Sequence, residues 1–144
     1  MSIEENKSLV RRYYEEVVNG CDLKRVCEFV SQNYVEVYNN VRHEVGIEGA
    51  KEHLAGVRNT YPDLHLTVER QIAEGEWVVT QITARGTHEG VWLNMRPTGK
   101  KVEITGVNVD RVVGGLIVEH GGAANTFEAL LEIGAIKVAD PVEE

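Results

Sequence analysis

The 144-residue sequence has few prolines, few cysteines and fewer basic than acidic residues, and it contains no long hydrophobic run. With three prolines and no Pro-, Gly- or Ser-rich stretch it lacks a linker, so we expect one domain over residues 1–144. A net charge of −8 argues against binding to nucleic acid or to an anionic membrane surface, because both favour basic faces. No apolar run approaches the ~20 residues that cross a bilayer. Neither nucleic acid nor a membrane is therefore expected as a partner.

The two cysteines, Cys21 and Cys27, have a spacing that forms neither a zinc nor a redox motif. We expect them to be buried free thiols, which are stable in a reducing compartment. The first residues combine neither a basic start nor an apolar stretch, so no signal peptide is expected. Together these features predict a cytoplasmic protein.

What the sequence does contain is typical of a globular protein, with 42% hydrophobic and 26% charged residues. A chain of this length buries about two-thirds of the surface that its unfolded form exposes. It can therefore form a core without disulfide or metal support.

The first half of the sequence shows helical spacing. Ser2 and Glu5 form a capping box, and apolar residues recur along residues 9–17 until Asn19-Gly20 ends the helix. Asp22 is expected to cap a second short helix. A short strand over residues 34–38 and a third helix over residues 47–60 follow.

From residue 64 the spacing changes to alternation, which is typical of strands. Strands are predicted over residues 64–68, 77–84, 101–109 and 116–118, with hairpin turns at Gly75 and at Gly114-Gly115, and a last helix over residues 127–133. Strands that follow helices in blocks indicate an α+β fold.

Four stretches carry a family resemblance: residues 9–17 (LVRRYYEEV), 61–64 (YPDL), 86–90 (GTHEG), and 97–100 (PTGK) running on to 117–120 (IVEH). In order and spacing they resemble the SnoaL-like polyketide cyclases of the nuclear-transport-factor-2-like superfamily, which also includes ketosteroid isomerase. The resemblance covers about residues 4–134. It strongly indicates the fold but only weakly the function, because this fold also serves for binding and for dimerisation.

The resemblance implies a cone-shaped α+β barrel, in which a curved antiparallel sheet with three N-terminal helices closes an apolar pocket. It also implies a homodimer that binds a small apolar molecule. Enzymes of this family use neither a metal nor an organic cofactor. They perform acid–base chemistry on activated substrates such as ketones.

Several groups that the family uses are replaced in this sequence. Val37 falls at the position of the general base, and Glu36 beside it is expected to face away, because neighbours on a strand alternate. Gly122 replaces the cyclase acid, and Asn125 falls where another acid often aligns. Gly121 and Gly122 are expected to enlarge a pocket. These changes argue against the aldol cyclisation of the family but not against a pocket.

The resemblance leaves four candidates for catalysis: Asn108, Asp110, His120 and Tyr14. Asn108 falls at an oxyanion-hole position, where its amide can polarise a carbonyl. Asp110 shares its strand face, so its carboxyl is either buried, and then paired or raised in pKa, or it is solvated beside an arginine. A two-residue turn at Gly114-Gly115 sends His120 outward, whereas a longer turn or a bulge at Gly121-Gly122 sends it inward.

Further residues are candidates for binding. Tyr34, Trp92, Met95 and Asn125 are expected to contact the substrate, and Trp92 and Met95 belong to a loop that rims the pocket mouth in the family. Core packing is an alternative role for the aromatic residues. The other histidines, His43, His53, His65 and His88, are expected on the surface or in loops, and no metal-ligand spacing is present.

Three functions remain open. The first is a cofactor-independent acid–base enzyme of the SnoaL-like or ketosteroid isomerase type, which acts on an apolar carbonyl compound as an isomerase, cyclase or dehydratase. The second is a binding domain of the same fold without catalysis, favoured by the lost groups at Val37 and Gly122. The third is a dimerisation domain with a filled cavity. The family favours the enzyme.

Overall fold

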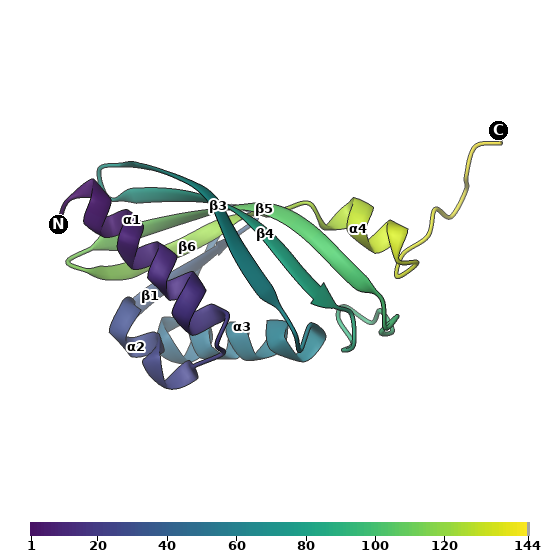
Figure 1. Ribbon diagram of the computed structural model, residues 1–144, viewed down its shortest axis with the longest axis horizontal. Helices are drawn as coiled ribbons and strands as arrows, with labels where there is room; N and C mark the ends of the chain where they lie inside the picture. The colour runs from purple at the N-terminus through teal and green to yellow at the C-terminus, as the bar shows by residue number, and fades with distance from the viewer. Residues whose placement is uncertain (144) are drawn as a thin grey trace.

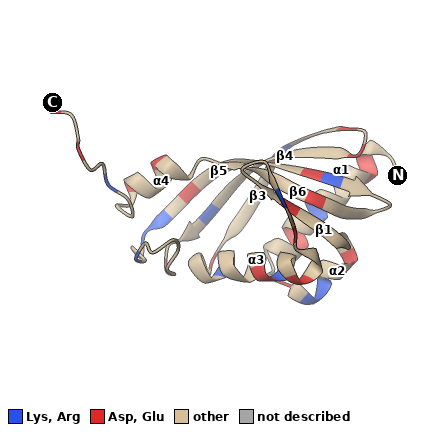
Figure 2. Ribbon diagram, turned by 180° about the vertical axis from the view of Figure 1, so that it is seen from behind, with Lys and Arg blue, Asp and Glu red and all other residues tan. Residues whose placement is uncertain are grey.

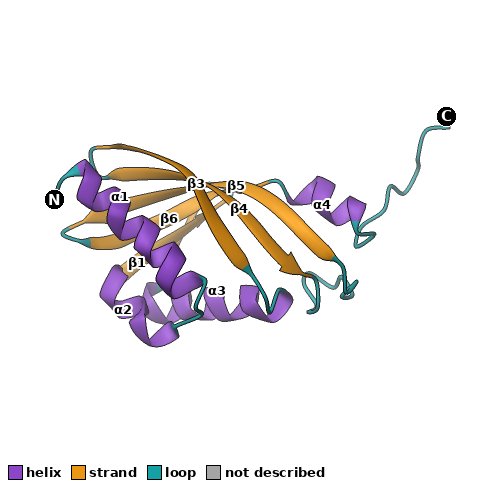
Figure 3. Cartoon of the chain, in the orientation of Figure 1, coloured by secondary structure: helices purple, strands orange, loops and turns teal. Residues whose placement is uncertain are grey.

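The computed structural model describes residues 1–143. One six-stranded sheet, in the order β2-β1-β6-β5-β4-β3, curves across the molecule (Figure 3). Its strands are β1 (Val30–Tyr38), β2 (Val41–Glu44), β3 (His65–Glu74), β4 (Trp77–Thr87), β5 (Lys101–Val113) and β6 (Leu116–Ala124). The predicted α+β class and curved sheet are confirmed. The sheet is open, with β2 and β3 at its edges, and its β1–β6 pairing is parallel, whereas all its other pairings are antiparallel.

The helices lie mostly to one side of the sheet (Figure 1). They are α1 (Ile3–Arg12), α2 (Val26–Phe29), α3 (Gly46–Thr60) and α4 (Thr126–Glu132). A main core packs α1 and α2 against the inner face of the sheet, around residues such as Val17, Phe29 and Ile117. A smaller core packs α4 on the N-terminal end of β5, around Val102 and Ile104 (Figure 1). Residues of α3 and of the inner face of the sheet together line a pocket.

The N-terminal helix begins and ends for different reasons. The capping box of Ser2 and Glu5 is present in full, as predicted. After Arg12 the backbone continues as a π-helix, Tyr13–Val18, and the Asn19 N–H donates to the Tyr14 carbonyl five residues back. The wider turn of a π-helix places Tyr13 and Tyr14, although neighbours, both inside the protein.

Three local predictions differ from the structure. Asp22 precedes a 3-10 turn, Leu23–Arg25, and its side chain caps nothing. Asn39 and Asn40, with φ of 50° and 62°, follow the end of β1 and form a tight hairpin turn into β2, a strand that was not predicted. Cys21 and Cys27 are free, as expected, but Cys21 is only half-buried and Cys27 is exposed.

The pairing of β5 with β6 decides which side chains face inward. The turn at Gly114-Gly115 has two residues, as predicted, since Val113 pairs with Leu116. The register then shifts: Val112 pairs with Ile117, but Arg111 pairs with Glu119, so Val118 is a bulge. Asp110 consequently pairs with His120, and both face the inside of the sheet. The bulge lies nearer the turn than the glycines at which it was expected.

Charged residues of both signs are spread over the helices and strands (Figure 2). Within residues 1–143, no helix is long and apolar enough to cross a membrane. Over the same residues, no three His, Cys, Asp or Glu side chains gather in a way that would hold a metal ion.

Candidate active site

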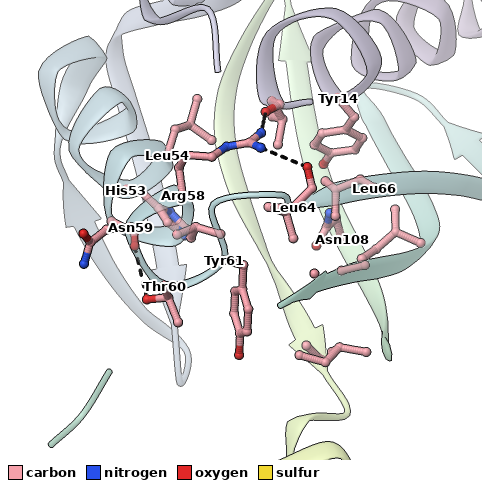
Figure 4. Close-up of a pocket in the computed structure, with 18 of the residues that line it drawn as sticks. Tyr14, His53, Leu54, Arg58, Asn59, Thr60, Tyr61, Leu64, Leu66 and Asn108 are labelled. Atoms are coloured by element: carbon pink, nitrogen blue, oxygen red, sulfur yellow. Dashed lines mark hydrogen bonds between the residues drawn. The ribbon is translucent and has the colours of Figure 1, made fainter. Parts of the chain in front are cut away.

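A cavity of about 670 Å³ lies between α3, the π-helix and the inner face of the sheet. Its wall is largely apolar and includes Leu54, Leu64, Leu66, Ile82 and Ile104 (Figure 4). Polar groups enter it from the π-helix, β1, β5 and β6, namely Tyr14, Tyr34, Glu36, Asn108 and His120. An apolar cavity with a few converging polar groups is the usual form of a small-molecule site.

Asp110 is the centre of a buried hydrogen-bonded chain. Its side chain is 1% exposed, and its two oxygens are used by different partners. The Tyr14 hydroxyl donates to Oδ2, and His120 Nδ1 lies 2.7 Å from Oδ1. Of the two interpretations of Asp110, the buried and paired one is therefore correct. Asp110 does not itself line the cavity but contacts it through His120 and Tyr14.

The environment shifts the pKa values of both partners of Asp110. Burial raises the pKa of the Tyr14 hydroxyl well above its usual value, and the nearby Asp110 charge raises it further, so Tyr14 remains a proton donor. Burial lowers the pKa of His120, but the charge and hydrogen bond of Asp110, with a contribution from Glu36, outweigh it. The net pKa of His120 is raised.

Asn108 lies two residues before Asp110 on the same face of β5, and it lines the cavity as predicted (Figure 4). Its amide can therefore donate to a bound carbonyl oxygen. The sheet thus brings Tyr14, Asn108, Asp110 and His120 together, although they come from three separate elements.

Glu36 departs from its predicted orientation, because it lines the cavity. The β1–β6 pairing contains a register shift between Val30 and Val35, after which Tyr34 and Glu36 share the inner face. His53 on α3, expected on the surface, also lines the cavity, and its Nδ1 lies 3.1 Å from Glu36 Oε1. A signal for Glu36 was available in the sequence: a strand that points Tyr34 inward also points the residue two positions later inward.

Gly121 and Gly122, which were expected to enlarge the pocket, do not do so. A Cβ on Gly121 would lie 3.2 Å from the Val37 Cβ, so Val37 fills that space. A Cβ on Gly122 would lie 2.2 Å from the Val107 carbonyl oxygen, so the backbone itself occupies the position. Neither glycine lines the cavity. The glycines serve close backbone approach instead.

The remaining candidates divide. Tyr34 and Trp92 line the cavity, and Trp92 belongs to a short exposed hairpin in which it pairs with Met95. Met95 does not line the cavity, because it packs on the small core beneath α4. Asn125 does not line it either: it is exposed at the start of α4, and its backbone N–H donates to the Thr105 carbonyl.

The raised pKa of His120 predicts a pH-dependent contribution to stability. Such a group stabilises the folded protein fully below its unfolded pKa of about 6.5, and the contribution is lost as the pH rises through the folded pKa. Urea denaturation at several pH values gives the free energy of unfolding of the wild type and of His120→Gln. We expect the advantage of the wild type over the variant to decrease as the pH rises through the pKa of folded His120.

An NMR titration tests whether the Asp110 charge causes the raised pKa of His120. In Asp110→Asn the raising charge is gone while burial remains, so the pKa of His120 should fall below its wild-type value. An unchanged pKa would show that Asp110 does not hold His120. Exposed His65 is the internal control in the same spectra.

The curved six-stranded sheet and the three N-terminal helices define a protein of the nuclear-transport-factor-2-like class. Within that class, the chain belongs to the SnoaL-like polyketide cyclase family, whose model matches residues 8–133.

Solved structures agree with this assignment. AclR of Streptomyces galilaeus, a proposed hydroxylase, is 27% identical, with 96% of this chain and 87% of that protein covered and a TM-score of 0.82. IdmH of Streptomyces antibioticus, a proposed polyketide cyclase, is 26% identical, with 90% and 98% covered and a TM-score of 0.77. A SnoaL-like protein of Jannaschia sp. CCS1, at 24% identity, 95% and 97% coverage and a TM-score of 0.82, supports the fold alone. No curated protein matches the chain.

Proposed function

We propose that this protein is a cofactor-independent acid–base enzyme that acts on a small apolar carbonyl compound. The observation that carries the proposal is the chain Tyr14–Asp110–His120, in which the central carboxylate is buried and both outer members reach an apolar cavity. A histidine held by a buried carboxylate is a common device for proton transfer, because the carboxylate fixes the ring and favours its protonated form.

The roles follow from the contacts. Because Nδ1 of His120 bonds Asp110, Nε2 is the ring nitrogen left for the substrate. Protonated His120 donates to the carbonyl oxygen as charge develops there, and the Asn108 amide is a second donor. Tyr14 and Asp110 are positioning residues, since the Tyr14 hydroxyl is already used by Asp110. Trp92 and Tyr34 bound the space for an apolar ring.

In the same proposal the chain forms one domain that works as a cytoplasmic homodimer. The outer face of β3, β4 and β5 supports the dimer, because it exposes the large apolar side chains Ile72, Trp77, Val107 and Val113. A second copy packed on this face would cover them.

Proton exchange of a model ketone tests the function. In D2O, NMR follows the replacement of hydrogen by deuterium at the carbon next to the carbonyl of 2-tetralone, an apolar bicyclic ketone. We expect the protein to accelerate exchange over buffer, and His120→Gln and Asp110→Asn to lose roughly 10²-fold or more, the usual contribution of a positioned acid or base. The exposed-site variant His65→Gln should keep the wild-type rate.

The alternative, a binding domain without catalysis, is favoured by the largely apolar wall of the cavity. It predicts that 2-tetralone binds, as shown by broadened NMR signals, while exchange stays at the buffer rate. That result would contradict the proposed enzyme.

A further inference from the structure

Glu36 and His53 form a second histidine–carboxylate pair in the cavity, and the function proposed above does not use it. Glu36 comes from β1 and His53 from α3, and both line the cavity. Their side chains are 22% and 48% exposed, so the pair connects the interior with solvent. The 3.1 Å contact joins Glu36 Oε1 to His53 Nδ1, and the Tyr34 hydroxyl is a further hydrogen-bonding neighbour of the carboxylate.

The sheet places Glu36 beside His120. The two residues are register partners on the neighbouring parallel strands β1 and β6, and both side chains face the cavity. Neighbouring strands lie about 4.8 Å apart. A substrate carbonyl that contacts His120 therefore brings its adjacent carbon within reach of Glu36. One acid and one base on the same side of a cavity are the arrangement that proton abstraction next to a carbonyl requires.

The charges around Glu36 suit this arrangement. It is faced by Tyr34 on its own strand, Tyr13 of the π-helix, His120 and His53, and His43 of β2 is its other register partner. Burial raises the pKa of Glu36, but the hydrogen bond and charge of His53 and the charge of His120 outweigh it, so the net pKa is lowered. Glu36 is then an anion beside a histidine whose own pKa is raised.

We propose that Glu36 is the base of this pocket and that His53 is its positioning residue and its route to solvent. The Glu36 carboxylate takes a proton from the carbon next to the substrate carbonyl. The C–H electron pair forms the carbon–carbon double bond, and the carbonyl oxygen receives the proton of His120. Neutral His53 with its hydrogen on Nε2 has a free Nδ1, so it accepts the proton of Glu36 at Nδ1 and releases the Nε2 hydrogen to water, and Glu36 is again a carboxylate. This inference rests on the proposed function.

The exchange of 2-tetralone in D2O tests Glu36. Glu36→Gln keeps the size of the side chain and removes its basicity, so exchange should fall roughly 10²-fold or more while 2-tetralone still binds. If Glu36→Gln folds poorly, Glu36→Asp is the second test. It keeps a carboxylate and should retain part of the exchange rate. Glu44→Gln on neighbouring β2 changes charge equally at an exposed site and should leave the rate unchanged.

His53→Ala tests the positioning role with readouts that a structural role would not move. Removal of His53 takes away a group that lowers the pKa of Glu36, so that pKa should rise in a carboxyl carbon NMR titration. The acidic limb of the pH–rate profile should move to higher pH with it. Free imidazole added to the His53→Ala protein should restore exchange. His65→Ala is the exposed control.

The outcomes separate this inference from the function. If the wild type accelerates exchange, His120→Gln abolishes it and both Glu36 variants match the wild type, Glu36 is not the base. If His53→Ala leaves the pKa of Glu36 and the rate unchanged, His53 has no part in the transfer. If the wild type does not exceed buffer, the proposed function fails and this inference with it.

Discussion

Replacement of Arg58 by Ala should lower the free energy of unfolding by about 3 kcal/mol or more, because one side chain satisfies four backbone carbonyls. Nη2 donates to the carbonyls of Val18 and Asn19, at 2.7 and 3.0 Å. Nη1 donates to those of Pro62 and Leu64, at 3.1 and 3.0 Å. Figure 4 shows the guanidinium of Arg58 turned toward the Leu64 carbonyl.

The effect is large because these carbonyls lie where helices end. The last carbonyls of a helix have no partner within it; Val18 ends the π-helix and Asn19 is its cap, and outside the helix the Val18 carbonyl also accepts from the Cys21 N–H. Pro62 and Leu64 follow α3 and lead into β3. The planar guanidinium reaches both segments at once, which the point charge of a lysine cannot do. Arg58 thereby holds together two walls of the cavity.

Urea denaturation measures this contribution. Arg58→Lys should lose most of it, which separates the fork-like geometry from the charge. Arg11→Ala removes an exposed ion pair to Glu15 and should change stability by less than about 1 kcal/mol. Wild-type stability in Arg58→Ala would show that water satisfies the four carbonyls equally well.

Much of the fold could be predicted because its elements alternate or repeat clearly. The meander from β3 to β6 and the helix over Gly46–Thr60 follow from spacing, since each presents one apolar face to a core. β2 could not be predicted in this way, because all four of its residues, Val41–Glu44, are exposed and carry no apolar pattern. The π-helix was missed because its sequence also suits an α-helix.

The candidate site was predicted where it depends on simple alternation. Asn108 and Asp110 are two residues apart on one strand, so a single orientation accounts for both. The orientation of His120 depends on the bulge at Val118, and no turn residue in the sequence marks that position. Glu36 was assigned outward because Val37 was matched to the family's base position. The inward Tyr34, two residues earlier, was the better guide.

Gly122→Asp, which restores the acid that the family's cyclases carry, should destabilise the protein by about 3 kcal/mol or more and create no catalytic group. A Cβ at this position would lie 2.2 Å from the Val107 carbonyl oxygen and 2.9 Å from the Asn108 Cα. These are backbone atoms of the paired strand β5, so no side-chain rotation relieves the contact. The φ of +145° is also a conformation that residues other than glycine rarely adopt.

Gly114→Asp separates the clash from the backbone strain. Gly114 also has positive φ, at 58°, but nothing lies within 4 Å of its Cβ position, so aspartate there should cost no more than about 1 kcal/mol. Urea denaturation compares the two variants, and 2-tetralone exchange should show no gain for Gly122→Asp. Wild-type stability in Gly122→Asp would mean that β5 and β6 move apart without cost. The close approach at Gly122 excludes the cyclase acid, so the proposed enzyme has to take its acid and its base from other residues.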